Sequence, residues 1–216
     1  MNLRKILYIV PGSPEPPDEA ERRLKILTSM AGPDTKIDTR SGTKGPLTIE
    51  SAYEEYLTIP ETCQVALEAV REGYDAIIIG CAGDPGLDAV RELVDIPVVG
   101  PGETSIYLAS LLGKKVLRVS PMTIGMTVLE TRENREKVLE KIEREGRKAI
   151  KEGKADVIVL ECMSLGFLEI SNDLQKRLRI PVIDPVRVSV KMAEMLIDLK
   201  LSHSKIAYPT PKRIWQ

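Results

Sequence analysis

The 216-residue chain has little of what several enzyme classes require: one histidine, three cysteines and only 4% aromatic residues. A single histidine argues against Ser-His-Asp and Cys-His hydrolases and against metal sites built from histidines. The cysteines Cys63, Cys81 and Cys162 lie too far apart in sequence for a zinc knuckle or a disulfide scaffold. We therefore expect no bound metal. With one Phe and one Trp, we also expect no platform for stacked nucleic-acid bases.

Charge of one sign is not in excess either. The formal net charge is -1, from 31 Lys and Arg against 32 Asp and Glu, so a broad basic field for nucleic acid is absent. No apolar run approaches the ~20 residues of a membrane span, and neither a G-x-G-x-x-G nor a Walker A pattern occurs. We expect a cytoplasmic protein that binds neither nucleic acid nor membranes and needs no cofactor. Asn and Gln are scarce and charged residues frequent, which is typical of thermophilic proteins.

Short β-branched runs alternate with longer charged segments of helical period along the chain. Such alternation predicts an α/β protein with mainly parallel sheets, and the continuous apolar strands indicate that helices cover both faces. The expected strands are Ile6–Val10, Lys36–Thr39, Ala76–Ile79, Val98–Val99, Val116–Val119, Val157–Leu160 and Val182–Ile183. The expected helices are Asp18–Met30, Ser51–Gly73, Asp84–Leu93, Glu103–Leu112, Thr127–Gly153, Gly166–Leu178 and Val186–Leu199.

An internal repeat is the most informative feature of the sequence. Three segments recur in the same order, and each copy ends in an Ile-Pro-Val strand. The second copy is shorter and lacks a counterpart of the Lys36–Thr39 strand. The chain is therefore predicted to consist of two related α/β units. The matched segments are Arg4–Pro11 and Lys114–Pro121, Asp75–Cys81 and Asp156–Cys162, and Ile96–Pro101 and Ile180–Pro185.

Cys81 and Cys162 close the same strand of the two copies, each just before an expected helix. Ligands of parallel sheets collect beyond the carboxyl ends of the strands, and a helix N-terminus lowers the pKa of a thiol. Two thiols on opposite sides of one carbon could invert a stereocentre, because one removes a proton and the other delivers one. Glu161 stands next to Cys162 and is expected to point away from the thiol, since consecutive strand residues face opposite sides.

The residues around Cys81 resemble a known family. Ile79–Ala89 (IGCAGDPGLDA) is similar to the first cysteine motif of hydantoin racemases, in the cofactor-independent aspartate/glutamate/hydantoin racemase superfamily. The resemblance implies two pseudo-symmetric Rossmann-like domains with mainly parallel sheets and a two-cysteine racemisation at their interface. It implies domains at 1–100 and 101–185, with a C-terminal helix at 186–204 that packs back on the first. Further segments that resemble the family are Thr48–Ser51 with Tyr53, Pro97–Gly100 with Glu103, and Pro181–Pro185.

The resemblance also suggests where the substrate binds. Cys81 and Cys162 match the family's two catalytic bases, and Pro11–Ser13 takes the place of its substrate loop, without that loop's asparagines. The expected cleft loops contain no Lys or Arg, which favours a neutral 5-substituted hydantoin as the small-molecule substrate. We expect a homo-oligomer. The expected substrate-binding residues are Gly12, Ser13, Ala82, Gly83, Thr123, Met163 and Ser164.

Other functions remain open at this point. The chain could be a thiol-dependent isomerase or decarboxylase of a small dicarboxylate, an acidic amino-acid racemase, or a non-catalytic two-lobed binding protein. Cys63 lies within a helical pattern and is expected to be structural, and Asp84 and Glu103 each have a helix-start explanation. His203 is expected to be an exposed tail residue, and Trp215 to dock the tail on the body or on a neighbouring subunit.

Overall fold

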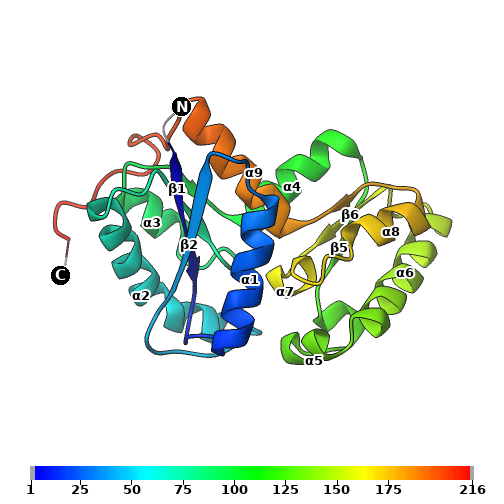
Figure 1. Cartoon of the computed structure of the whole chain (residues 1–216). Helices are drawn as coiled ribbons and strands as arrows, with labels where there is room; N and C mark the ends of the chain where they lie inside the picture. The colour runs from blue at the N-terminus through cyan, green and yellow to red at the C-terminus, as the bar shows by residue number, and fades with distance from the viewer. Residues whose placement is uncertain (1–2, 215–216) are drawn as a thin grey trace. The chain divides into compact units, whose positions relative to one another are not determined.

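Parallel strands alternate with helices through the computed structural model, which describes residues 3–214 (Figure 1). All the expected strands are found close to their expected bounds. The strands are β1 (Arg4–Val10), β2 (Thr35–Ser41), β3 (Ala76–Ile79), β4 (Val98–Val99), β5 (Val116–Val119), β6 (Val157–Leu160) and β7 (Val182–Ile183). The helices are α1 (Pro17–Met30), α2 (Ala52–Arg71), α3 (Leu87–Leu93), α4 (Pro101–Leu112), the 3-10 helix η1 (Met122–Ile124), α5 (Val128–Glu133), α6 (Arg135–Lys151), α7 (Met163–Gly166), α8 (Ser171–Leu178) and α9 (Pro185–Asp198).

The chain divides into two compact units. The first comprises the residues up to Pro101 and those from Ser189 onward, and the second comprises Gly102–Val188. The division falls inside α9, whose first turn belongs to the second unit and whose remainder belongs to the first. The C-terminal helix expected at 186–204 corresponds to α9, which ends at Asp198.

The first unit is built on a parallel sheet of order β2-β1-β3-β4. Its two central strands are in register at Ile6 and Ala76, and their side chains alternate between the two faces. Helices α1 and α2 lie on opposite sides of this sheet (Figure 1). The core on the side of α2 and α3 consists of Leu7, Ile9, Val65, Ala66, Ala69, Ile77, Ile79, Leu87, Val90, Val94 and Val98.

The second unit has a smaller parallel sheet of order β5-β6-β7. Its central strand β6 is fully buried, whereas Arg118 on the edge strand β5 is exposed. Ala109 of α4 packs with Val157, Val159 and Ile183 on one face. The larger cluster on the other face joins the strands to η1, α6 and α8, and its members include Val119, Ile124, Leu139, Ile142, Ile158, Leu160, Leu174 and Leu178.

The two sheets confirm the internal repeat. Strands β1, β3 and β4 lie in the same order as β5, β6 and β7, while β2 is the additional edge strand of the first unit. Equivalent aspartates also make equivalent bonds. The Asp75 carboxylate accepts the N–H of Lys5 at 2.8 Å, and the Asp156 carboxylate accepts the N–H of Lys115 at 2.8 Å.

Two segments that were each predicted as one helix are broken in the structure. The segment expected to form one helix at Thr127–Gly153 is broken at Asn134, which has φ -145° and caps α6 by accepting the N–H of Lys137. The segment expected at Gly166–Leu178 is divided between α7 and α8, and Glu169 between them has a positive φ of 54°. Within residues 3–214, no helix is both long and apolar enough to cross a membrane.

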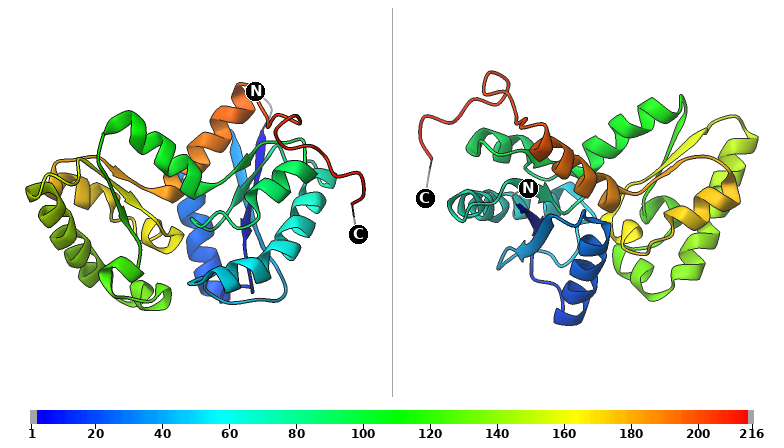
Figure 2. Two further views of the ribbon diagram at one scale, coloured as in Figure 1. Left: turned by 180° about the vertical axis from the view of Figure 1, so that it is seen from behind. Right: turned by 45° about the horizontal axis from the view of Figure 1, so that its top comes forward.

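The segment after α9 returns to the edge of the first sheet (red in Figures 1 and 2). His203 is half-buried there, and its Nε2 accepts the N–H of Val98 on the edge strand β4 at 2.8 Å. Lys205 donates to the carbonyl groups of Arg91 and Val94 at the end of α3, at 2.9 and 2.8 Å. The expectation that His203 is an exposed tail residue is therefore wrong. Trp215 lies outside the described residues.

Candidate active site

Cys81 lies just beyond the carboxyl end of β3, in a turn that leads to α3. Its carbonyl accepts the N–H of Asp84 at 3.0 Å, and Asp84 has a positive φ of 54°. Helix α3 begins only at Leu87, after Gly86 in the left-handed conformation. The expected helix start at Asp84 is therefore wrong, and the N-terminus of α3 does not follow Cys81 directly. The side chain of Cys81 is half-buried.

Cys162 occupies the equivalent place beyond β6. It is the N-cap residue of the four-residue helix α7, with extended backbone (φ -159°, ψ 133°), and its carbonyl accepts the N–H of Leu165 at 3.1 Å. The thiol is half-buried. The preceding residue, Glu161, forms an ion pair with Arg118 on the neighbouring strand β5. This ion pair balances the charge of the carboxylate that stands next to Cys162.

The loop after β1 is held in place by the strand-to-helix connection 42–51. Gly12 has a φ of 100°, and a Cβ on it would collide with the carbonyl oxygen of Pro46. The N–H of Ser13 donates to that carbonyl at 3.1 Å, and the Ser13 hydroxyl donates to the carbonyl of Gly45 at 2.5 Å. Both groups of Ser13 are thus used to hold the loop. Ser13 is an expected substrate-binding residue, and for its hydroxyl to donate to a substrate, that proton would have to turn away from Gly45.

The other predicted binding residues differ in exposure. Ala82 is half-buried and Gly83 exposed, both in the turn after Cys81. Thr123 is exposed in η1, where its hydroxyl donates to the carbonyl of Ser120 at 2.8 Å. Met163 and Ser164 are buried, with only 4% and 6% of their surface exposed. Direct substrate contact remains a prediction for all of them.

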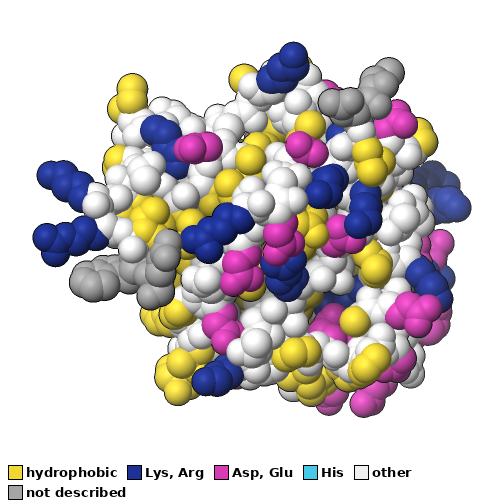
Figure 3. Space-filling model, turned by 60° about the vertical axis from the view of Figure 1, so that its left-hand side comes forward, with side chains coloured by type: hydrophobic (Ala, Val, Ile, Leu, Met, Phe, Trp, Pro, Cys, Tyr) yellow, Lys and Arg dark blue, Asp and Glu magenta, His cyan; other side chains and the backbone are white. Residues whose placement is uncertain are grey.

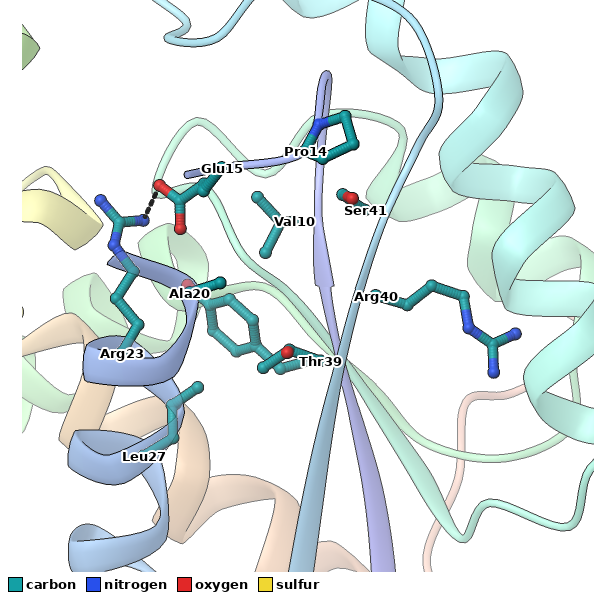
Figure 4. A pocket seen from close by; sticks show the side chains of 10 residues that line it. Val10, Pro14, Glu15, Ala20, Arg23, Leu27, Thr39, Arg40 and Ser41 are labelled. Carbon is teal, nitrogen blue, oxygen red and sulfur yellow. Dashed lines mark ion pairs between the residues drawn. The ribbon is translucent and has the colours of Figure 1, made fainter. Parts of the chain in front are cut away.

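A cavity of about 180 Å³ lies in the first unit between α1 and the carboxyl ends of β1 and β2 (Figure 4). At its wall, Arg23 forms ion pairs with Glu15 at 2.9 Å and Glu19 at 2.7 Å. The Arg23 and Glu15 side chains are only 7% and 5% exposed. This buried pair ties the end of the Gly12–Ser13 loop to α1, and no pattern in the sequence indicates it. Arg40, which also lines the cavity, extends toward α2 (Figure 4) and pairs there with Glu72.

The remaining candidates have structural surroundings. Cys63 packs on the apolar core between α2 and the sheet, and burial raises the pKa of its thiol, as expected for a structural cysteine. No group of three His, Cys, Asp or Glu side chains within residues 3–214 is arranged to hold a metal ion. On the face shown in Figure 3, Lys and Arg side chains are interspersed with Asp and Glu.

The sequence is similar to a known protein family. The model of the Asp/Glu/Hydantoin racemase family matches residues 20–122. A hydantoin racemase of Pseudomonas sp. (strain NS671) is 38% identical over 212 residues, covering 86% of this chain and 84% of that protein. The chain belongs to the Asp/Glu/hydantoin racemase family. A hydantoin racemase of Paenarthrobacter aurescens is 32% identical over 196 residues, covering 79% of this chain and 82% of that protein.

A solved structure extends the similarity to the fold. The allantoin racemase from Klebsiella pneumoniae aligns with a TM-score of 0.86 and 26% identity, over 99% of this racemase and 96% of that chain. The predicted α/β class with parallel sheets is confirmed, as is the prediction of an isomerase that acts as a racemase. The expected homo-oligomer stays a prediction.

Proposed function

We propose that this racemase inverts the C5 stereocentre of a 5-substituted hydantoin, with Cys81 and Cys162 as its two acid/base groups and no cofactor. The observation that carries the proposal is their equivalence. Each thiol follows the strand that lies between the first and last strands of its repeat. Packing alone does not demand the same residue at both places. A chemical function for the thiol explains why a cysteine stands at both.

The proposed reaction balances with two thiols. One, as thiolate, takes the C5 proton, and the electron pair of the C–H bond moves into the adjacent carbonyl to give an enolate. The opposing thiol then gives its proton to the other face of C5, which leaves the first group as thiol and the second as thiolate. Backbone N–H groups of the turns at Ala82–Gly83 and Met163–Ser164 would stabilise the enolate oxygen.

The similarity to enzymes with named substrates supports a cyclic ureide. The curated relatives are hydantoin racemases, and the aligned structure is an allantoin racemase. Allantoin is itself a hydantoin with a ureido group at C5, so the same chemistry serves both. Apolar residues in the candidate loops, such as Met122, which is 67% exposed, favour a hydrophobic C5 substituent. Allantoin is the second candidate substrate.

The test is chiral chromatography of 5-benzylhydantoin, 5-isobutylhydantoin and allantoin, beside aspartate and glutamate. Enzyme-free samples correct for spontaneous racemisation of the ureides. We expect racemisation of at least one ureide, its loss in Cys81→Ala and in Cys162→Ala, and its retention in Cys63→Ala. Rapid racemisation of aspartate or glutamate with all ureides inert would overturn the substrate class. Activity that survives loss of either matched cysteine would overturn the two-base mechanism.

A further inference from the structure

The first turn of α2 directs a carboxylate at the cysteine loop. Ser51 caps the helix by accepting the N–H of Glu54, and the Glu54 carboxylate accepts the N–H of Glu50 at 2.7 Å and the Ser51 hydroxyl at 2.9 Å. This reciprocal cap fixes the turn in which the next residue, Glu55, stands. The N–H of Glu55 donates to the carbonyl of Ser51 at 3.0 Å. The position of Glu55 is therefore set by a well-anchored helix start.

The Glu55 carboxylate packs against Gly83, two residues after Cys81. A Cβ on Gly83 would collide with Oε1 of Glu55, and the same point lies 3.7 Å from Sγ of Cys81. The carboxylate and the thiol thus lie next to the same point of the loop, the thiol at ordinary van der Waals distance from it. Glu55 is half-buried, and its carboxylate has no hydrogen bond or ion pair with any residue the structure describes.

A carboxylate in this position has a defined chemical preference. When ionised it only accepts hydrogen bonds, and bonds that N–H groups donate to it are shorter and stronger than neutral ones. It also repels a second negative charge brought into the same space. A hydantoin ring offers an N–H at N1, which is bonded to C5, and a second N–H at N3, and it carries no carboxylate. A free amino acid brings its own carboxylate to the reacting carbon.

We propose that Glu55 is a specificity-determining residue: its carboxylate accepts a ring N–H of the substrate next to Cys81 and disfavours substrates with a carboxylate at the stereocentre. This inference rests on the proposed function, because it assumes a cyclic ureide at the Cys81 loop. Its role is in binding. The proton at C5 is transferred by the thiols, and Glu55 holds the ring.

The first experiment measures binding without catalysis. Unsubstituted hydantoin has no stereocentre, so its affinity for the enzyme can be measured by calorimetry, along with that of its N1-methyl and N3-methyl derivatives. We expect Glu55→Ala to bind hydantoin about tenfold or more weakly, the size of a lost charge-assisted hydrogen bond. One of the two methyl derivatives, the one that lacks the bonded N–H, should bind the wild type about as weakly as Glu55→Ala binds hydantoin. Its affinity should not fall further in Glu55→Ala. Glu140→Gln, an exposed charge on α6, is the matched control and should bind like the wild type.

The inference is overturned if Glu55→Ala binds hydantoin like the wild type. It is also overturned if each methyl group costs the variant as much affinity as it costs the wild type. If the wild type racemises ureides while the Glu55 variants behave normally, this inference fails and the proposed function stands. If the wild type neither binds nor racemises any ureide, both fail.

The second experiment tests the proximity of Glu55 to Cys81 without any substrate. In a background with Cys63→Ala and Cys162→Ala, the rate of Cys81 alkylation by iodoacetamide is followed against pH. Removing a nearby negative charge favours the thiolate, so Glu55→Gln should move the profile to lower pH, while Glu140→Gln should leave it in place. An unmoved profile in Glu55→Gln would show that the carboxylate does not act at the thiol, and would overturn the inference.

Discussion

Gly80 and Glu161 hold equivalent places in the two copies of the repeat. The N–H of Gly80 donates to the carbonyl of Ile9 at 2.6 Å, and the N–H of Glu161 donates to that of Val119 at 2.7 Å. Each bond fixes the end of a central strand to the first strand of its unit, and the next residue in each copy is a cysteine. In the first copy a Cβ on Gly80 would lie 2.5 Å from both the carbonyl oxygen of Ile9 and Cε1 of Tyr8, so glycine is needed there.

This equivalence predicts that each thiol serves one face of the substrate. With Cys81→Ala or Cys162→Ala in deuterated buffer, we expect exchange of the C5 proton in one enantiomer only, and the opposite enantiomer in the other variant. A single remaining base removes the proton from its own side and returns deuterium there, so exchange proceeds without inversion. Proton NMR of each resolved enantiomer measures it. Equal exchange of both enantiomers by one variant would indicate a single mobile base.

The loop after β1 should depend on glycine at position 12 for two reasons. Gly12 has a φ of 100°, and a Cβ there would meet the carbonyl oxygen of Pro46. Gly73 is the matched control, because it has a φ of 76° but nothing lies within 4 Å of its Cβ position. Gly73→Ala should cost about 1 kcal/mol of unfolding free energy from backbone strain alone. Gly12→Ala should cost more and should also lower turnover. If urea denaturation showed the same loss of unfolding free energy for Gly12→Ala and Gly73→Ala, the backbone at Pro46 would have to move aside without cost.

The buried ion pair of Arg23 and Glu15 should contribute far more to the unfolding free energy than the exposed ion pair of Arg22 and Glu19. Arg23→Met leaves the Glu15 carboxylate, only 5% exposed, without its guanidinium partner. We expect a loss of about 3–5 kcal/mol in unfolding free energy. Arg22, whose side chain is 42% exposed, also pairs with Glu19, and Arg22→Met should cost under about 1 kcal/mol. Urea denaturation of both variants measures the difference. Similar losses would mean that burial of the Arg23 pair does not determine its contribution.

The same cluster should make stability fall in acid. Burial opposes the charged form of Glu19, but hydrogen bonds from Arg22 and Arg23 lower its pKa to about 2, from 4.5. A folded pKa below the unfolded value means that ionised Glu19 stabilises the protein above about pH 4.5. This contribution is lost as the pH falls toward about 2. Glu19→Gln should therefore flatten the decline of thermal stability between these values, and an unchanged decline would contradict the assignment.

The sequence predicted what repeats and periodicity encode. The matched segments ending at Cys81 and Cys162 were enough to predict two parallel sheets with a thiol at the same strand end. Continuous apolar runs such as Ala76–Ile79 could be predicted as strands, because strands covered on both faces have that pattern. The helix breaks were missed because one residue decides each of them. Asn134 fits a polar helix face equally well until its side chain is seen to cap α6.

Contacts between side chains on distant segments could not be predicted from the sequence. Glu55 and Gly83 stand on different elements, and nothing in either segment signals that the carboxylate rests on the cysteine turn. The pairing of Glu15 with Arg23 depends on how the loop enters α1. A glycine whose missing Cβ leaves room for a neighbour was the one available signal. In a single sequence, such a glycine looks the same as one chosen for a turn.

The C-terminal segment should protect the edge of the first sheet. His203 supplies through Nε2 the acceptor that the Val98 N–H would otherwise lack on the edge strand β4, at 2.8 Å. His203→Ala should raise the amide hydrogen-exchange rate of the peptide containing β4 and lower the unfolding free energy by about 1 kcal/mol. His203→Gln keeps an acceptor at the end of its side chain and should restore part of the protection. Ile206→Ala, at a side chain 96% exposed on the same segment, is the control and should exchange like the wild type. Normal exchange of β4 in His203→Ala would show that the strand is held without this bond.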